Sequence, residues 1–234
     1  YGNWAYDLFC KGNEDQDWSS FQFTTLDGGQ VDTDEIEQAK ADLDVRTFRQ
    51  EYLATFETYA GAIYYNFDRE QNVQTIKQDE TTVHIGMDFN INPMSAAIFQ
   101  LKNNVINFID EIVIYSSNTE ELVKEIKTRY PNRQVIVYPD PACRQRKTSA
   151  GGKTDLTILQ NAGLTVRVKN QHPQVRDRIN AVNSRLKNTN DQRMMFIHPK
   201  CKNIIRGLER HLYKEGTTQP DKDSGFDHMN DAIG

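Results

Sequence analysis

Two acidic residues lie at places in the sequence that call for a chemical explanation. In HIGMDFNINP, Asp88 interrupts an apolar run that is typical of a buried strand. A carboxylate that faces a protein core costs several kcal/mol unless it is paired, protonated or bound to a cation. In YPDPA, Asp140 directly follows the apolar run that ends at Tyr138. That place is the carboxyl end of a predicted strand, where open α/β sheets usually carry their sites.

The C-terminal stretch DHMNDAI adds a third acidic position. Asp227 and Asp231 are four residues apart, so a helix places both on one face, and His228 lies between them in the sequence. Acidic side chains that converge from strand ends and a helix suit Mg²⁺ or Mn²⁺, which prefer oxygen ligands. Two such ions about 4 Å apart can hold the attacking and leaving oxygens of a phosphodiester. The residues therefore predict a metal site for phosphodiester cleavage.

Each of these residues also has a simpler explanation. Asp88 can cap a turn with the asparagines that follow it, Asp140 lies between two prolines as in an Asx turn, and Asp231 can be a solvated helix residue. Only the combination favours a metal site. Asp110 and Glu111, within one predicted strand, form a further acidic candidate. One solvent-facing side chain and one cross-strand pair are the simpler explanation for them.

The elements that must position these residues begin near residue 81. Asn103 and Asn104 fit the tight turn of a hairpin, and Asn118 or Ser117 can cap the helix that follows it. The predicted order is strands at 81–90, 94–104 and 105–115, a helix at 116–132, a strand at 133–142, a helix through 156–159, a strand at 163–169, a helix at 173–188, a strand at 193–199, and helices at 201–213 and 226–234.

This order suits an α/β protein of RNase H-like fold, with a mixed central sheet flanked by helices. In that fold the first three strands are antiparallel, and the strand after the first helix lies parallel beside the first strand. Asp88 and Asp140 would then lie on neighbouring strands, whose axes are about 4.8 Å apart. Two carboxylates that close repel each other unless one is protonated or a cation lies between them. The periodicity alone also allows other mixed α/β sheets.

Charge is distributed unevenly along the chain. Residues 1–80 contain 6 Lys and Arg against 17 Asp and Glu, whereas residues 141–214 contain 16 against 4. The first segment is an acidic, aromatic-rich lead-in with a predicted turn at 27–29 and predicted helices at 33–43 and 45–56. The basic charge of the second segment is what a polyanion-binding surface requires, although a solvated face also accounts for it.

The stretch SAGGKTDL matches a phosphate-binding loop only in part, because the full pattern requires a glycine where Lys147 stands. We expect the basic residues of this glycine-containing loop to meet a DNA backbone instead; they are Arg144, Arg146, Lys147 and Lys153. On the predicted helix at 173–188, phosphate contacts and a solvated face are equally open for Arg176, Arg178 and Arg185.

These stretches resemble one family, the large terminase subunit of tailed bacteriophages, whose C-terminal nuclease domain is RNase H-like. The matching features are GMDFN on the first strand, YPDPA with GGKTDLTILQNAGL after it, and DHMNDAI on the last helix. The lead-in resembles the family in YGNWAYDLF, FTTLDGG and above all RTFRQEYLATFE. The resemblance implies that residues 1–80 join a motor ATPase domain to a nuclease domain at 81–234.

The resemblance implies a metal-dependent endonuclease that cuts double-stranded concatemeric viral DNA during genome packaging. Asp88, Asp140 and Asp231 match the catalytic carboxylates that bind two Mg²⁺ or Mn²⁺ ions. Three further residues are auxiliary candidates: His228, Asp227 and Glu111. The implied partners are double-stranded DNA, the ATPase domain of the intact chain, the portal and the small terminase subunit. The implied place of action is the host cytoplasm, at the procapsid.

Two other functions stay open. A catalytically weak module could dock DNA or the portal through the basic surface. An actin-like ATPase would need a glycine after the acidic residue of the first strand, and GMDFNINP has none. The sequence has no apolar run of the roughly 20 residues that a membrane helix needs. Three distant cysteines fit a reducing compartment, and a chain that begins at Tyr1 suggests a fragment of a longer polypeptide.

Overall fold

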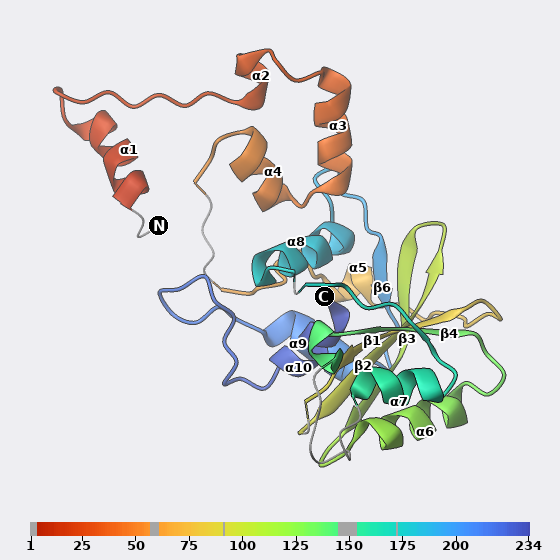
Figure 1. Cartoon of the computed structure of the whole chain (residues 1–234). Coiled ribbons are helices and arrows are strands. Elements are labelled where there is room, and N and C mark those ends of the chain that lie inside the picture. Colours follow the sequence, from red (N-terminus) through yellow and green to blue (C-terminus); the bar gives the residue numbers. More distant parts are fainter. Residues whose placement is uncertain (1–3, 57–60, 91, 145–153, 172) are drawn as a thin grey trace.

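The computed structural model describes residues 4–56, 61–90, 92–144, 154–171 and 173–234. Within them a six-stranded mixed sheet lies in the body at the lower right of Figure 1. The strands are β1 (Val83–Asp88), β2 (Met94–Lys102), β3 (Val105–Ile114), β4 (Val135–Pro139), β5 (Thr165–Val166) and β6 (Met195–Ile197). Their order across the sheet is β5-β4-β1-β2-β3-β6. The predicted RNase H-like arrangement is confirmed, because β1, β2 and β3 are antiparallel and β4 lies parallel beside β1.

Local sequence signals account for the first half of the sheet. The hairpin between β2 and β3 turns at Asn103 and Asn104, as predicted, with positive φ values of 51° and 65°. Asparagine tolerates this conformation better than most residues. The helix α6 (Thr119–Arg129) begins after the predicted cap Asn118, whose side chain accepts a hydrogen bond from the N–H of Glu121.

The strand β5 is much shorter than the predicted strand at 163–169. Within the described part of that segment, Thr165 and Val166 are the residues that pair with β4. In a parallel sheet, the backbone N–H and C=O groups of every second residue point toward the same neighbouring strand. The carbonyl of Val137 accepts a hydrogen bond from the N–H of Arg167, which follows β5. The backbone groups of Val137 and of Pro139, two residues later, therefore face β5. Because Pro139 has no N–H to donate, the ladder ends there.

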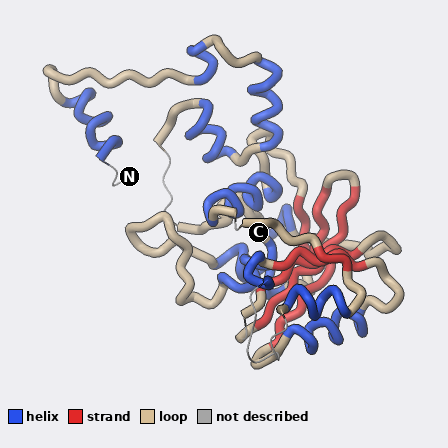
Figure 2. Tube along the Cα trace, viewed as in Figure 1, coloured by secondary structure: helices blue, strands red, loops and turns tan. Residues whose placement is uncertain are grey.

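Helices cover both faces of the sheet, as the tube in Figure 2 shows. On one face lie α6 and α7 (Asp155–Asn161), and on the other lie α8 (Val175–Leu186), α9 (Lys202–Arg210) and α10 (Asp227–Ile233). Alternation along β1 directs its side chains. Val83, Ile85 and Met87 belong to the core beneath α6 and α7. Gly86 and Asp88 therefore face the side of α10.

About half of the described lead-in is helical. Its helices are α1 (Trp4–Glu14), α2 (Thr25–Gly28), α3 (Thr33–Asp42), α4 (Val45–Tyr52) and α5 (Arg69–Asn72). At the start of α3, the Asp32 side chain accepts a hydrogen bond from the N–H of Asp34. The predicted turn at 27–29 is instead the end of the short helix α2, which Gly29 closes in a left-handed conformation with φ 61°.

The last part of the lead-in packs into the core formed by α8, α9 and the sheet. Ile63 is 0% and Tyr64 is 5% exposed in this core. The fully buried Asn72 donates hydrogen bonds to two main-chain carbonyls of α8 and β6, and Val73 forms a bridge with β6. Residues 61–73 are therefore packed as part of the body, while the domain boundary at residue 80 stays a prediction.

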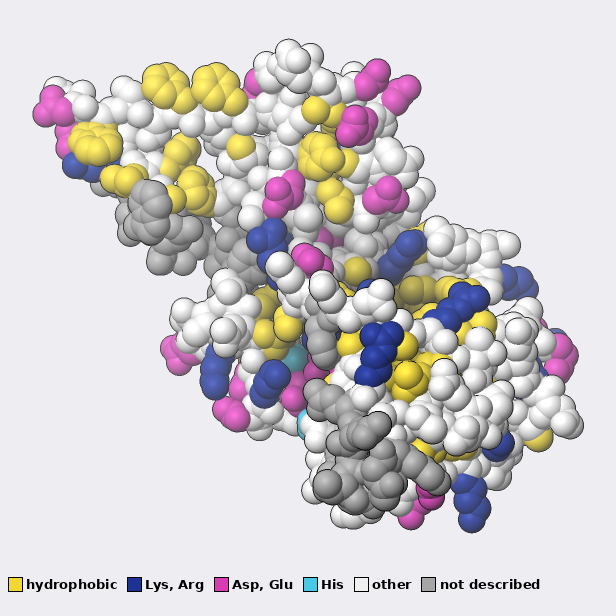
Figure 3. Space-filling model, in the orientation of Figure 1, with side chains coloured by type: hydrophobic (Ala, Val, Ile, Leu, Met, Phe, Trp, Pro, Cys, Tyr) yellow, Lys and Arg dark blue, Asp and Glu magenta, His cyan; other side chains and the backbone are white. Residues whose placement is uncertain are grey.

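Apolar side chains remain exposed on the outer lead-in, where Figure 3 shows them gathered at the upper left. Phe21 is 74% and Phe23 is 71% exposed, and their rings stack on each other with centroids 6.4 Å apart. Among the described residues, no helix combines the length and the apolar character needed to cross a membrane.

Candidate metal centre

Asp88 and Asp140 lie side by side at one edge of the sheet. The register of the parallel strands β1 and β4 pairs Met87 with Pro139. The next residues are Asp88, which ends β1, and Asp140, which directly follows β4. Neighbouring strands are about 4.8 Å apart. The Oδ1 atom of Asp140 accepts a hydrogen bond of 2.7 Å from the N–H of Ala142. The Asx turn therefore does not exclude a site at this edge, because the same hydrogen bond fixes the orientation of the Asp140 carboxylate.

The helix α10 brings Asp231 to this edge by a close approach to β1. A Cβ atom added to Gly86 would lie 1.9 Å from the carbonyl oxygen of Ala232. On the other side of α10, the Asn230 side chain donates a hydrogen bond of 3.2 Å to the carbonyl of Gly207 in α9. The helix can lie this close to the strand because β1 presents a glycine to it.

The pKa of Asp88 reports the crowding of negative charge. Burial raises this pKa to about 6, the charge of Asp231 and then that of Asp140 act in the same direction, and His228 opposes them. The carboxylates therefore interact electrostatically. Bringing them together costs free energy that a bound cation would recover.

His228 lies between two carboxylates. Its Nδ1 atom is 3.2 Å from Oδ2 of Asp88 and 3.0 Å from Nδ2 of Asn90. Its Nε2 atom is 3.8 Å from Oδ1 of Asp227. Asp227 is 9% exposed, and within the described part of the chain this Oδ1 atom has no hydrogen-bond partner. The imidazole thus connects a buried carboxylate to Asp88.

Asp231 is paired with a cation of the chain itself. Its Oδ1 atom is 3.0 Å from Nη1 of Arg178, and the two side chains are 41% and 21% exposed. Both residues line a cavity of about 230 Å³ together with Asp140, Arg167 and Lys169. Sequence reasoning did not single out Arg167 and Lys169. The available signal was their alternation in TVRVK, which places both on one side of an extended segment.

The predicted basic loop lies largely outside the described residues. Arg144 ends the 3-10 helix η1 (Pro141–Arg144), which directly follows Asp140, and it is exposed. Its Nη2 atom donates to Oδ1 of Asn170 at 3.5 Å. The other residues of the prediction, which are Arg146, Lys147 and Lys153, are not among the described residues.

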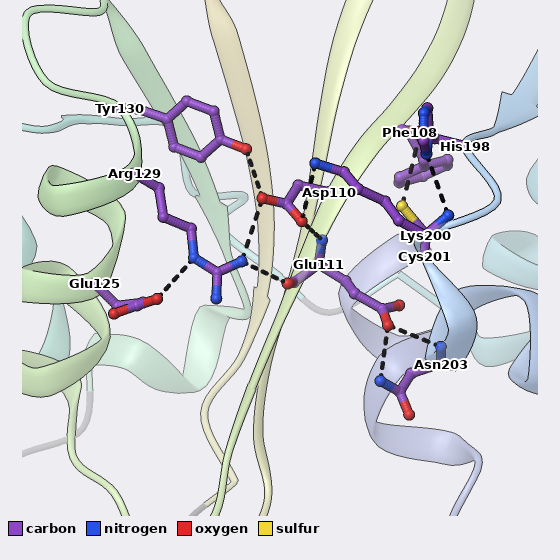
Figure 4. Close-up of polar contacts among 10 residues, drawn as sticks. All are labelled: Phe108, Asp110, Glu111, Glu125, Arg129, Tyr130, His198, Lys200, Cys201 and Asn203. Carbon is purple, nitrogen blue, oxygen red and sulfur yellow. Dashed lines mark hydrogen bonds and ion pairs between the residues drawn. The ribbon is translucent and has the colours of Figure 1, made fainter. Parts of the chain in front are cut away.

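Glu111 is engaged at the start of α9, as Figure 4 shows. Its Oε1 atom accepts hydrogen bonds from the N–H of Asn203 at 2.9 Å and from the side chain of the same residue at 2.8 Å. Its Oε2 atom accepts from the N–H of Ile204 at 2.9 Å. Its neighbour Asp110 accepts from Tyr130 at 3.1 Å and from Arg129 at 3.2 Å. Glu111 therefore acts as a helix cap, and these contacts do not join it to the other carboxylates.

The donors at the sheet edge suit a hard divalent cation in kind. Carboxylate oxygens are the ligands that Mg²⁺ and Mn²⁺ prefer, and Asp88 and Asp140 present them from adjacent strands. In the described part of the chain, no three His, Cys, Asp or Glu side chains are gathered closely enough to hold an ion. Asp231, the third predicted ligand, forms an ion pair with Arg178.

A mixed sheet of this order, with helices on both faces, is the arrangement of an RNase H-like domain. The chain belongs to the family described as the terminase RNaseH-like domain, whose model matches residues 85–234. The resemblance to large terminase nuclease domains is thereby confirmed.

Individual relatives agree with this membership. The chain is 32% identical over 78 residues to the terminase large subunit of Escherichia phage T5, a match that covers 32% of this chain and 18% of that protein. The large terminase of a thermophilic bacteriophage, solved in complex with ATP-gamma-S, superposes with a TM-score of 0.69 at 19% identity and covers 98% of this chain. The chain spans 58% of that ATP-gamma-S-bound terminase.

Two solved nuclease domains match the body of the chain. The nuclease domain of the P22 large terminase has a TM-score of 0.55 at 13% identity, over 73% of this chain and 89% of that one. The large terminase nuclease of the thermophilic phage G20c with bound magnesium has a TM-score of 0.50 at 12% identity, over 74% and 95%. At these identities the likeness shows a shared fold.

Proposed function

We propose that this chain is a divalent-metal-dependent endonuclease that cleaves double-stranded concatemeric DNA during viral genome packaging. The observation that carries the proposal is the position of Asp88 and Asp140 as neighbours on parallel strands, with Asp231 brought toward them by α10. Membership of the terminase RNaseH-like domain family supports a nuclease. The related G20c nuclease was solved with bound magnesium, which supports the same class of cofactor here.

In this proposal Asp88, Asp140 and Asp231 hold two Mg²⁺ or Mn²⁺ ions. When bound, the ions supply an activated water and stabilise the charge on the leaving 3′ oxygen. Other residues of the chain orient these ligands. His228 fixes the Asp88 carboxylate from one side, and the buried Asp227 supports the imidazole. Glu111 contributes indirectly by holding the start of α9 against β3.

The DNA backbone, in the same proposal, lies against the basic residues near this edge. Arg167 and Lys169 line the cavity that contains Asp140 and Asp231. Arg144 is exposed just beyond Asp140. The same proposal gives a DNA-binding role to Arg146, Lys147 and Lys153, which follow Arg144 in the sequence. Such contacts bind phosphates without reading bases.

The lead-in connects this nuclease to an ATPase domain in the proposed intact protein. The ATP-gamma-S-bound large terminase matches 98% of this chain, whereas the P22 nuclease domain matches 73%. The difference supports a role for the lead-in outside the nuclease domain. The portal and the small terminase subunit are further proposed partners, and the host cytoplasm is the proposed place of action.

A plasmid cleavage assay tests this function. The chain is incubated with supercoiled plasmid in Mn²⁺, in Mg²⁺ and in EDTA, and linear products are expected only with a metal ion. Retention of the plasmid on the protein without cleavage in any metal would contradict the nuclease proposal. That outcome would favour a DNA-docking module instead.

A further inference from the structure

We propose that Arg178 is a resident cation of the metal-free centre, which holds Asp231 until a metal ion takes the carboxylate and then binds a phosphate of the DNA backbone. The inference rests on the proposed function, because Asp231 is a metal ligand only in that function. It adds a positioning residue that couples metal binding to DNA binding.

The geometry of α8 keeps Arg178 within reach of both partners. Ile179 and Val182 anchor α8 in the core, at 6% and 3% exposure. The stem of Arg178 packs where α10 ends, since a Cβ atom added to Gly234 would lie 3.3 Å from Cβ of Arg178. The backbone is thus fixed, and only the end of the side chain has room to change partner.

The position of the ion pair makes an exchange of partners inexpensive. Arg178 and Asp231 both line the 230 Å³ cavity that contains Asp140 and a second cavity of about 420 Å³ that contains Asp227. The pair therefore stands between two open spaces, and its side chains are 21% and 41% exposed. An ion pair with this exposure contributes little to stability.

The chemistry of the two partners gives the exchange its direction. A divalent ion attracts the Asp231 carboxylate more strongly than a single guanidinium charge does. The guanidinium keeps its charge at any working pH and matches a phosphate with two parallel hydrogen bonds. The ion pair with Arg178 offsets the charge of Asp231 while no metal ion is bound.

This exchange also accounts for an observation on the described residues. No three His, Cys, Asp or Glu side chains among them form a set that could hold an ion. Asp88 and Asp140 are adjacent, and the third acid is directed at Arg178 with its Oδ1 atom 3.0 Å away. Release from Arg178 is the one step that the proposal requires to complete the set.

The test compares Mn²⁺ affinity by calorimetry, without DNA, in the parent and in Arg178→Gln. Removal of the competing cation is expected to tighten Mn²⁺ binding by up to about fivefold. In Ca²⁺, the same variant is expected to bind DNA more weakly, with a salt slope reduced by up to about one unit. Arg178→Lys keeps the charge and should restore the Mn²⁺ affinity of the parent.

The matched control is Arg176→Gln, which removes the same charge two positions earlier on α8, where Arg176 pairs with Glu51 at 3.1 Å. It should leave Mn²⁺ affinity unchanged, and Arg178→Gln should have no effect in an Asp231→Asn background. If the parent binds Mn²⁺, unchanged or weaker Mn²⁺ binding in Arg178→Gln would overturn the inference. Equal tightening in Arg176→Gln would overturn it too. A parent that bound no Mn²⁺ would overturn both this inference and the proposed metal centre.

Discussion

Gly86 of β1 lies directly against the backbone of Ala232 in α10, so closely that an added Cβ atom would be 1.9 Å from the carbonyl oxygen. Two residues further along β1 is Asp88, and one residue before Ala232 is Asp231. The contact between a glycine and a carbonyl therefore sets the separation of two of the proposed metal ligands. A helix held further from the strand would carry its acid away from the other two.

We expect Gly86→Ala to displace α10 and to impair the centre. Overpacking of this kind costs about 1–3 kcal/mol of unfolding free energy. Urea denaturation measures the loss, and metal-dependent cleavage should fall with it. The control is Gly28→Ala, since a Cβ atom at Gly28 meets no atom within 4 Å. Stability and cleavage equal to the parent in Gly86→Ala would show that α10 does not depend on this contact.

The raised pKa of Asp88 predicts how the stability of the metal-free protein depends on pH. Burial and the charge of Asp231 raise this pKa to about 6, above the ordinary value of about 4. Below pH 4 the group is protonated in both the folded and unfolded states. As pH rises through 6, the folded state must ionise a group that it prefers to keep neutral, so stability is lost, by roughly 1–3 kcal/mol.

Asp88→Asn removes this titration and serves as the comparison. In EDTA, the variant should be more stable than the parent at pH 7.5, and the difference should shrink as pH falls toward 4. Thermal melts across this range measure it. A difference that stays constant from pH 4 to 8 would mean that Asp88 does not carry the shifted pKa.

Glu111→Ala separates a structural role from a role at the centre. The carboxylate accepts three hydrogen bonds from Asn203 and Ile204 at the start of α9. Their loss should lower the unfolding free energy by about 1–2 kcal/mol. Cleavage measured below the unfolding transition should change little. Glu125→Ala loses one exposed ion pair with Arg129 and should cost about 0.5 kcal/mol or less. A cleavage defect in Glu111→Ala as large as that of Asp140→Asn would show that Glu111 has a role in the metal centre.

Replacement of Arg144, Arg146 and Lys147 together tests the basic surface. We expect weaker DNA binding and a salt slope flattened by up to about one unit per lost contact, nearly independent of DNA sequence. Fluorescence anisotropy at several salt concentrations provides both quantities. Unchanged affinity and slope would show that these residues do not touch the backbone.

The strands that carry Asp88 and Asp140 could be predicted, because alternation and turn residues define β1 to β4. Their adjacency followed only from the RNase H-like arrangement, since the periodicity alone also allows other mixed sheets. The partner of Asp231 could not be predicted in the same way. The Arg178 contact depends on where α8 and α10 cross above the sheet, and periodicity gives the faces of helices but not their crossing positions.

The lead-in shows the same limit. The resemblance to the family implied a connecting segment throughout residues 1–80, and no local pattern separates residues 61–73 from the rest. Ile63 and Tyr64 are buried in one cluster with residues of α8 and α9, and these contacts form only through long-range packing. The simpler explanation for Asp110 and Glu111 was one solvent-facing side chain and one cross-strand pair. The partner of Glu111 is instead the start of α9, 92 residues further along the chain, and no local pattern indicates a contact at that distance.

The central claim is that Asp140 takes part in metal-dependent cleavage as a ligand rather than only as a turn residue. Asp140→Asn keeps the side-chain oxygen that accepts from Ala142 and removes the charge. Plasmid cleavage in Mn²⁺ is measured for the parent, for this variant and for the exposed-surface control Asp191→Asn. The account predicts a loss of at least about 100-fold in Asp140→Asn at unchanged melting behaviour, with the control equal to the parent. Cleavage by Asp140→Asn at the rate of the parent would contradict it.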